Sequence, residues 1–495
     1  MRSSTAESYD LVVIGGGPGG STVSTLTAKQ GHRVLLLERG TFPRYQIGES
    51  LLPATVHGIA RLLGVDQELR RAGFTKKRGG TFRWGANPEP WTFSFAVSPK
   101  LAAPTSYAYQ VERMKFDQIL LDNARANGVE VRESSTVVDV IEVDGRVGGV
   151  RYVDADGGEH TVEATFVVDA SGNTGRTHRH VGGERRYSEF FRNLALFGYF
   201  EGGKRLPEPY SGNILSAAFD DGWFWYIPLS PTLTSVGAVV HRDAAEKVQG
   251  DREAALNRLI EACPLIKEYL ADARRVTSGP YGELRVRKDY SYCDTRFWRP
   301  GMALVGDAAC FVDPVFSSGV HLATYSGLLA ARSINSCLAG TVGEKEAFQE
   351  FERRYRREYG VFYEFLVSFY GMHVDEQSYF WAAKKVTKTP LPELEAFVEL
   401  VGGLASGDVI GGTPESVADE LVGGAEALAE AADGSDTSSG ELHAKPVVAN
   451  AMAESANLQA EILLGAEATP LFPDGLVSTL DGLHWTYPRA SPAPR

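Results

Sequence analysis

The stretch YDLVVIGGGPGG, residues Tyr9 to Gly20, decides the fold together with VLLLERG at Val34 to Gly40. An apolar run leads into a G-x-G-x-x-G turn, a helical segment follows, and a second apolar run ends in an acidic residue, Glu38. This order is typical of the βαβ unit that binds a dinucleotide. A plain glycine turn between a strand and a helix is the alternative interpretation of the glycines alone.

Each glycine of this turn has its own physical task. Gly15 permits the tight turn, Gly17 lets the backbone approach a pyrophosphate, and Gly20 lets helix and strand pack closely. The helix N-terminus offers unpaired N–H groups to the phosphates, and Glu38 is placed to hold the adenosine ribose hydroxyls. The residues predicted to bind the dinucleotide here are Gly15, Gly17, Pro18, Gly20, Glu38 and Arg39.

Composition limits the classes of function. A chain of 495 residues with 43% hydrophobic content is globular and long enough for about two or three domains. Its formal charge of -13 gives no net attraction to the phosphate backbone of a nucleic acid, so we expect no nucleic-acid partner. No apolar run approaches the roughly 18 residues of a membrane span, and the N-terminus lacks the pattern of a signal peptide.

Cysteine usage points to a reducing compartment. The four cysteines lack metal-ligand spacing, so we expect neither a zinc site nor a disulfide scaffold, and we expect a cytoplasmic protein. They are Cys263, Cys293, Cys310 and Cys337.

Two segments after the first βαβ unit carry candidate polar residues. Thr41 to Gly58 is expected to be an irregular loop leading into a helix, and its polar residues, Ser50 among them, suit a loop against the cofactor. An ordinary surface loop is the alternative. Lys76 and Lys77 then precede a predicted strand, where basic residues are most often solvated.

The middle of the chain is predicted to be rich in antiparallel strands. Two Asp-Gly hairpin signals between 131 and 172 indicate a three-stranded unit that ends in FVVDASG, where Asp169 and Gly172 suit a second close approach to a cofactor. Strands between 193 and 240 form a second sheet, a natural wall for a substrate cavity. Trp223 and Trp225 alternate with Phe224, so both indoles face one side, either as core tryptophans or as part of the site.

A second strand, turn and helix follow at Met302 to Asn335. Gly306-Asp307 ends the strand, and the segment before Gly319 opens a long helix whose N–H groups make an anion site for a phosphate or a halide, or simply a capped helix start. The remainder is predicted to be helical at 348–372, 391–400, 414–432 and 448–464, with a flexible loop at 432–440.

The G-x-G-x-x-G turn at Gly15 to Gly20, called the fingerprint below, resembles part of the FAD-dependent aromatic hydroxylase superfamily. The DASG strand end and the later LVGDAA complete this resemblance. The resemblance implies an α/β fold: an FAD-binding Rossmann-like domain with an inserted antiparallel β-sheet substrate region and a C-terminal helical domain. We expect residues 1–365 to form the core, with the substrate sheet at 186–295, and 366–495 to form the helical domain. By resemblance, Asp307 contacts the ribityl-phosphate arm of the flavin, and Arg113 also reaches the cofactor.

Two further motifs resemble flavin-dependent halogenases. GWFWYIPLS is similar to their W-x-W-x-I-P motif, and FVDPVFSSGV is similar to F-x-x-P-x-x-S-x-G. FPRYQIGESLLPATVHG, KRGGTFRWG and YRREYGVFYEFLVSFY look like the halogenases of glycopeptide-antibiotic pathways of the balhimycin and teicoplanin type. That likeness implies chlorination of the phenol ring of a tyrosine or β-hydroxytyrosine held on a carrier domain of a nonribosomal peptide synthetase.

The mechanism of that family assigns roles by resemblance. FADH2 from a separate flavin reductase reacts with O2 to a flavin C4a-hydroperoxide, which oxidises chloride to hypochlorous acid. Ser318 and Gly319 hold the halide, Lys77 guides the hypochlorous acid to the ring, and Trp223 and Trp225 keep the substrate from the flavin. Lys76 is the adjacent competitor of Lys77. Tryptophan halogenases carry a glutamate where this chain has Phe316, which leaves the use of a second acid in doubt.

Two other functions remain open at this point. An FAD-dependent aromatic monooxygenase of the same fold would insert oxygen instead of halogen, and the tryptophan motif with Lys77 separates the two readings. A flavin-binding scaffold or sensor without turnover is the third.

Overall fold

The first sheet is built around the N-terminal strand. The computed structural model describes residues 7–84, 89–95, 106–371 and 470–488. Parallel pairing joins the central strands in the order β18-β10-β1-β2-β7, with antiparallel β17 at one edge and the β8-β9 hairpin extending from β10. The eight strands are β1 (Glu7–Ile14), β2 (Val34–Leu37), β7 (Glu130–Arg132), β8 (Thr136–Val143), β9 (Arg146–Val153), β10 (Glu159–Asp169), β17 (Trp298–Arg299) and β18 (Met302–Leu304).

The expected βαβ unit is confirmed. Every residue of β2 is buried, as befits a strand covered on both faces of a parallel sheet. The predicted hairpin at Asp144-Gly145 also forms, with positive φ at both residues, so the antiparallel unit of β8, β9 and β10 is confirmed.

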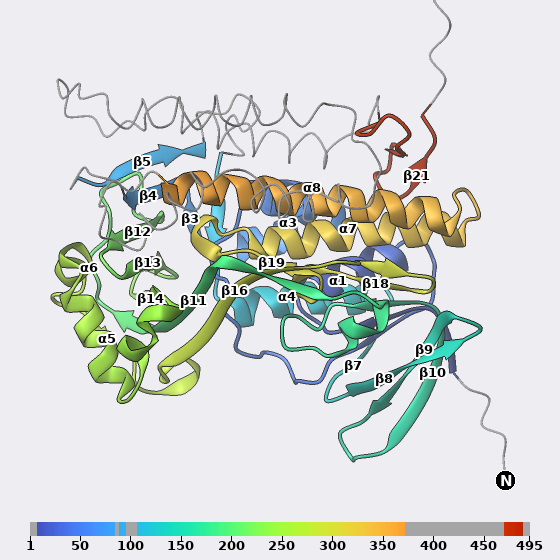
Figure 1. The fold of residues 1–495 in the computed structure, drawn as a ribbon, viewed down its shortest axis with the longest axis horizontal. Coiled ribbons are helices and arrows are strands. Elements are labelled where there is room, and N and C mark those ends of the chain that lie inside the picture. Colours follow the sequence, from blue (N-terminus) through green and yellow to red (C-terminus); the bar gives the residue numbers. More distant parts are fainter. Residues whose placement is uncertain (1–6, 85–88, 96–105, 372–469, 489–495) are drawn as a thin grey trace, which may run out of the picture.

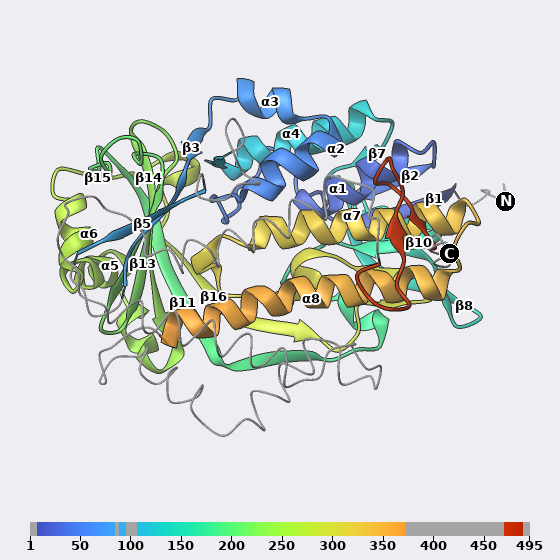
Figure 2. The same ribbon diagram turned by 90° about the horizontal axis from the view of Figure 1, so that it is seen from above.

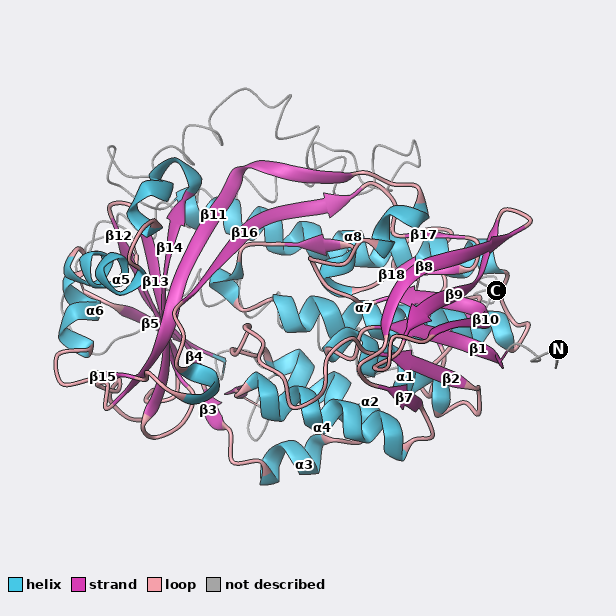
Figure 3. Cartoon of the chain, turned by 90° about the horizontal axis from the view of Figure 1, so that it is seen from below, coloured by secondary structure: helices cyan, strands magenta, loops and turns pink. Residues whose placement is uncertain are grey.

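The second sheet is mainly antiparallel and has nine strands, in the order β19-β16-β11-β14-β13-β12-β4-β5, with β15 beside β11. Figure 3 shows the long strands β11 and β16 running from this sheet toward the first one. The strands are β4 (Gly79–Arg83), β5 (Trp91–Ser94), β11 (Arg185–Glu201), β12 (Ile214–Phe219), β13 (Gly222–Pro228), β14 (Leu233–His241), β15 (Arg274–Arg275), β16 (Arg285–Asp294) and β19 (Cys310–Phe311). The segment near residue 80 therefore joins the sheet expected from 186–295.

The two faces of the second sheet bury different side chains. Trp223 and Trp225 belong to the main core, which the second sheet shares with the first sheet and the long helices, whereas Phe224 packs on the opposite face with the helices after residue 250. The prediction that both indoles share a face is confirmed, and it follows from the period of two along β13.

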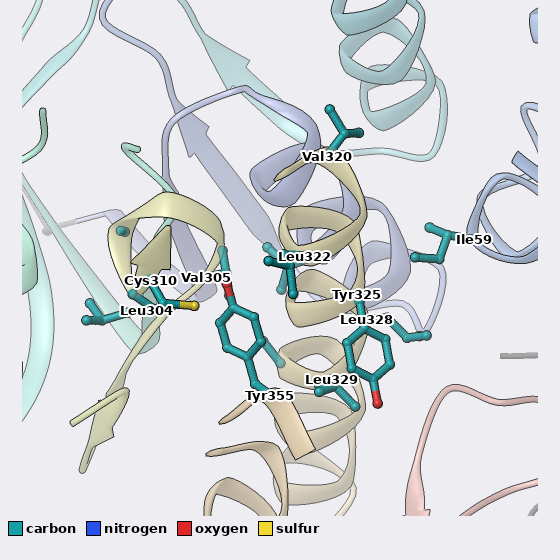
Figure 4. Close-up of a cluster of buried hydrophobic side chains, with 14 of the residues drawn as sticks. Ile59, Leu304, Val305, Cys310, Val320, Leu322, Tyr325, Leu328, Leu329 and Tyr355 are labelled. Carbon is teal, nitrogen blue, oxygen red and sulfur yellow. The ribbon is translucent and has the colours of Figure 1, made fainter. Parts of the chain in front are cut away.

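Long helices connect the two sheets. α7 and α8 run side by side (Figures 1 and 2), and α7 also packs on α1. Figure 4 shows how α7 is held: Leu322, Leu328 and Leu329 lie in a buried cluster with Leu304 of β18 and Tyr355 of α8. The helices are α1 (Pro18–Ala28), α2 (Ala60–Leu63), α3 (Asp66–Arg71), α4 (Arg113–Ala126), α5 (Arg252–Glu261), α6 (Pro264–Tyr269), α7 (Gly319–Leu338) and α8 (Glu344–Gly371).

Some expectations are modified by the structure. The helical stretch expected from 252 to 273 is two helices, α5 and α6, because Pro264 starts a new helix. The expected helix at 348–372 is α8, which carries the chain across position 365 without a break. The expected helices at 391–400, 414–432 and 448–464 and the loop at 432–440 lie outside the described residues, and the domain division stays a prediction.

The remaining elements are short. The minor strands are β3 (Thr75–Lys77) paired with β6 (Ala108–Gln110), and β20 (Val477–Ser478) paired with β21 (Trp485–Thr486). Among the described residues, no helix has the length and apolar character needed to cross a bilayer.

The fingerprint glycines make a testable prediction about stability. A Cβ at Gly20 would lie 1.9 Å from the Gly15 carbonyl oxygen, whereas a Cβ at Gly17 would meet only Arg44 Nη2, at 3.5 Å. We expect Gly20→Ala to lower the free energy of unfolding by about 3 kcal/mol because the helix must move from the strand. Gly17→Ala, the matched control, should stay within about 1 kcal/mol of the wild type. Equal losses in thermal unfolding experiments would contradict this account.

Candidate active site

A buried lysine lies where three distant segments meet. Lys77, the last residue of β3, is only 3% exposed. Its Nζ donates to the Leu51 carbonyl oxygen at 3.1 Å and to Ser317 Oγ at 3.4 Å. The same ammonium lies 5.7 Å from the centre of the Phe95 ring. The structure thus brings Lys77 to the turn before α7, 240 residues away in the sequence.

The Lys77 ammonium is buried without an acidic partner among the described residues. Burial lowers the pKa of Lys77 from its usual 10.5 to about 7. Among the described residues, no acidic side chain forms an ion pair with it. The neighbouring Lys76 is exposed and lies over the Tyr107 ring at 4.9 Å, which makes Lys77 the one of the two that faces the interior.

The turn before α7 is held by a buried carboxylate. Asp313 accepts hydrogen bonds from the Val315 backbone N–H, from Asn193 Nδ2 and from the Tyr370 hydroxyl. Burial raises the pKa of this aspartate to about 6. The network fixes a short 3-10 turn, Pro314–Phe316, after which Ser317 adopts a left-handed conformation with φ of 61°.

The residues after this turn form an open backbone surface at the N-terminus of α7. Ser318 is the N-cap and is 1% exposed, while a Cβ at Gly319 would meet no atom of the described residues within 4 Å. Phe316 is buried, and its ring lies 6.4 Å from that of Phe82. The N-terminus of a twenty-residue helix carries partial positive charge, so this space suits an anion.

The two tryptophans of β13 form a continuous wall with centroids 6.3 Å apart. Trp223 is 1% exposed, and among the described residues its Nε1 has no hydrogen-bond partner. Trp225 donates from Nε1 to Ser235 Oγ at 3.1 Å and packs against Gly237, where a Cβ would lie 2.2 Å from its ring. Both indoles are therefore fixed in place.

At the fingerprint, Glu38 bonds to neighbouring backbone groups and Gly17 stays accessible. Glu38 accepts hydrogen bonds from the backbone N–H groups of Gly16 at 2.7 Å and Gly40 at 2.8 Å. Arg44 Nε lies 3.6 Å from Glu38 Oε1. Its guanidinium is also the nearest group to the Cβ position of Gly17, so a cation stands beside the expected phosphate site.

Arg113 and Asp307 lie close enough to influence each other. Arg113 pairs with Asp117 at 2.7 Å and donates to the carbonyl oxygens of Ile47 and Gly48. Burial raises the pKa of Asp307 to about 6, and the positive charges of Arg113 and Arg185 oppose this shift.

Four other predicted cofactor residues have distinct positions. Asp169 accepts hydrogen bonds from the Ser171 backbone N–H and from the Thr177 hydroxyl, so it shapes the turn after β10. Gly172 lies in that turn with φ of 78°. Arg39 is exposed and donates to Thr174 Oγ1 at 3.3 Å in the same turn. Ser50 is 6% exposed, and its hydroxyl has no partner within the described residues.

The residues present fit an FAD molecule. Within the described residues, the Gly17 Cβ position has space beside Arg44, the buried Ser50 hydroxyl has no partner, and the start of α7 at Gly319 offers backbone N–H groups to an anion. Sequence reasoning missed Arg44, Glu49 and the Ser317 hydroxyl. The first two stand in the polar loop from 41 to 58 that was expected against the cofactor, so their location was available but their contacts were not.

Comparison with known proteins gives the family. The model of the family described as "Tryptophan halogenase" matches residues 10–102 and 97–416. The tryptophan 2-halogenase of Chondromyces crocatus is 36% identical over 390 residues, covering 78% of this chain and 72% of that protein. This chain belongs to the tryptophan halogenase family. It is a flavin-dependent halogenase that acts on an aromatic substrate with FAD and a halide.

Solved halogenase structures agree with the fold. The myxobacterial chondrochloren halogenase CndH, described as a variant of FAD-dependent halogenases, is 56% identical, with a TM-score of 0.78 over 97% of this chain and 100% of that one. The flavin-dependent halogenase CmlS is 31% identical, with a TM-score of 0.76 over 97% of this chain and 84% of that one. The expected α/β halogenase fold is confirmed. The glycopeptide tyrosine halogenase type is not shown by these relatives.

The buried Lys77 predicts a pH-dependent stability difference. Between pH 7 and 10.5, Lys77 is protonated in the unfolded chain and neutral in the folded chain. The contribution of Lys77 to the free energy of unfolding therefore becomes more favourable as the pH rises across that window. Lys77→Met should therefore raise the melting temperature most below pH 7, where the protonated lysine costs several kcal/mol at about 1.4 kcal/mol per pKa unit. The advantage should shrink toward pH 10. Thermal unfolding of both proteins across pH tests this.

Lys76→Met is the matched control. Lys76 is exposed, so its substitution should give a small difference in melting temperature that does not change with pH. A Lys77→Met difference that is equally flat would show that the Lys77 ammonium is solvated.

Proposed function

We propose that this halogenase chlorinates the phenol ring of a tyrosine or β-hydroxytyrosine unit tethered to a carrier domain of a nonribosomal peptide synthetase, in glycopeptide-type antibiotic biosynthesis. The observation that carries the proposal is the pairing of a buried Lys77 with the turn at Ser317, where Phe316 replaces a carboxylate. A phenol is electron-rich, so one cation that orients the halogen is sufficient. The sequence motifs shared with glycopeptide halogenases support the same substrate class.

Lys77 carries the central role in this proposal. FAD, bound in its reduced form FADH2, would give two electrons to O2, and chloride would give the other two as it is oxidised to hypochlorous acid. The Lys77 ammonium then hydrogen-bonds the hypochlorous acid and directs its chlorine to the ring carbon. With a pKa of about 7, Lys77 can also exchange its proton near neutral pH.

The halide and the tryptophans complete the arrangement. The backbone N–H groups at Ser318 and Gly319 hold chloride at the start of α7, where the helix dipole favours an anion. We expect Trp223 and Trp225 to separate the substrate from the flavin; the burial of both indoles in the main core and the hydrogen bond of Trp225 to Ser235 support this role.

The cofactor contacts follow the fingerprint and the strand ends of the first sheet. Backbone at Gly17 and the start of α1 receive the pyrophosphate. The other residues proposed to contact FAD are Gly15, Pro18, Gly20, Glu38, Arg39, Ser50, Arg113, Asp169, Gly172, Asp307 and Gly319.

Two partners are proposed. A flavin reductase supplies FADH2, if only by diffusion, and the carrier domain presents the phenol. The four free cysteines are compatible with a cytoplasmic location, where both partners operate.

The substrate class is tested by a product assay. The purified enzyme receives chloride, a flavin reductase with FAD, and either free or carrier-loaded tyrosine and β-hydroxytyrosine. We expect a chlorine in place of a ring hydrogen on the carrier-loaded substrates, detected by mass spectrometry. Chlorination of free amino acids alone would overturn the carrier requirement, and oxygen insertion without chlorine would indicate an aromatic hydroxylase.

Lys77→Ala tests the role of the buried ammonium. Chlorination should fall by about 100-fold or more, because the hypochlorous acid loses its directing group. FAD affinity should stay unchanged, which flavin fluorescence titration measures. Lys76→Ala, at the exposed neighbour, is the matched control and should chlorinate at the wild-type rate. Full chlorination by Lys77→Ala would remove Lys77 from the mechanism.

Gly17→Val tests the position of the cofactor. Among the described residues, only Arg44 lies near the Gly17 Cβ position, so the folded chain can accept a side chain there, and that side chain would occupy the expected pyrophosphate site. We expect the fold to be kept and FAD binding to be lost in fluorescence titration. Normal FAD binding would show that the pyrophosphate lies elsewhere.

A further inference from the structure

Glu49 lies in the middle of a short segment that links the two ends of the site. Arg113 contacts the carbonyl oxygens of Ile47 and Gly48, and Lys77 contacts that of Leu51. Glu49, between them, is 2% exposed. The backbone of the segment that carries Glu49 thus contacts both Arg113 and Lys77.

The Glu49 carboxyl is the inner end of a hydrogen-bonded chain. The Tyr199 hydroxyl donates to Glu49 Oε1 at 2.7 Å, and the hydroxyls of Tyr45 and Tyr199 are 2.7 Å apart. Tyr45 is only partly buried, so this chain leads from the buried acid toward the surface.

The second oxygen of the carboxyl is not satisfied. Among the described residues, Glu49 Oε2 has no hydrogen bond of ordinary geometry. The Ser235 hydroxyl, which accepts from Trp225 Nε1, lies close enough to lower the pKa of Glu49. The Glu49 carboxyl therefore lies near the serine that holds the Trp225 indole.

The surroundings favour the neutral acid. Burial raises the pKa of Glu49 to about 7; Tyr199, Ser235 and Arg113 oppose the shift, and Glu112 adds to it. At the outer end of the chain, the Arg285 guanidinium lies 3.7 Å from the centre of the Tyr45 ring, and Arg287 also faces Tyr45. Near neutral pH, Glu49 therefore retains a proton for a large fraction of the time.

The reaction requires a proton inside the protein. Oxidation of chloride consumes one: FADH2, O2, chloride and H⁺ give FAD, hypochlorous acid and water. Chlorination of the ring then consumes hypochlorous acid and releases water without a further proton. By contrast, unproductive oxidation of FADH2 by O2 gives FAD and hydrogen peroxide and takes up no proton. Halogenation and peroxide release therefore differ in their demand for a proton.

We propose that Glu49 is the buried proton source for halide oxidation, reloaded from solvent through Tyr199 and Tyr45. The O–H bond at Oε2 breaks, and its proton ends in the water formed with the hypochlorous acid. Tyr199 then passes its hydroxyl proton to Oε1, Tyr45 passes its own to Tyr199, and Tyr45 takes one from a hydronium ion in the solvent. A half-turn of the carboxyl group and rotation of the two tyrosine hydroxyls restore the starting state.

The first test uses the cofactor-free enzyme. Infrared difference spectroscopy across pH should show the carbonyl band of a buried, protonated carboxylic acid that is lost near pH 7, and Glu49→Gln should lack this band. Lys77 loses its charge in the same pH range but has no carboxyl band, so the two titrations are distinguished. A spectrum of Glu49→Gln identical to that of the wild type would overturn the proposal.

The second test measures how FADH2 oxidation is divided between products. Glu49→Gln and Tyr199→Phe should consume FADH2 at the wild-type rate but release hydrogen peroxide in place of chlorinated product, with chlorination reduced by about 10-fold to 100-fold. The chlorination rate of the wild type should fall as the pH rises through the pKa of Glu49. Glu49→Gln should lack this component of the fall.

Tyr281→Phe is the matched control. Tyr281 packs on Tyr199 with ring centres 4.4 Å apart, but its hydroxyl donates to Glu112 and is not part of the chain to Glu49. It should keep the wild-type product ratio. An unchanged ratio and pH profile in both Glu49→Gln and Tyr199→Phe would overturn the proposal even if the infrared band is found.

Discussion

A buried ammonium without an acidic partner is the constraint on which the site depends. Taking Lys77 out of water costs free energy, and among the described residues no ion pair offsets this cost. The contacts of the ammonium there are with the Leu51 carbonyl, Ser317 and the Phe95 ring. Such a cost persists where the rest of the fold supplies enough stability, which here comes from a continuous core shared by both sheets. The same burial lowers the pKa of the amine to about 7.

The segment from Ile47 to Leu51 couples the two halves of the site. One end of the segment accepts a hydrogen bond from Arg113 and the other end accepts one from Lys77, so four residues of backbone separate the two cation contacts. Glu49 adds a second buried ionisable group to this segment, and its pKa is shifted upward while that of Lys77 is shifted downward. Both groups approach the same value from opposite sides because burial disfavours either charge.

Helix α7 is the mechanical link between the sheets. Its start carries Ser318 and Gly319, the proposed halide site, and its body packs on α1 and α8, which fixes the position of that start relative to the G-x-G-x-x-G turn. Aromatic contacts of α8, such as Tyr370 with Trp84 and with Phe191, tie the same helix pair to the second sheet. The wall of Trp223 and Trp225 is fixed against this frame.

Local patterns in the sequence determined the βαβ unit, the Asp-Gly hairpin and the shared face of Trp223 and Trp225, because each depends on residues close together in the chain. The family motifs also identified a halogenase. Only the tertiary structure decided that Lys77 is inside and Lys76 outside, since neighbours in a strand face opposite ways and the pairing of β3 with β6 sets which face is buried. The contacts of Lys77 with Ser317 and of Glu49 with Tyr199 join residues 240 and 150 positions apart, and no local periodicity records such distances.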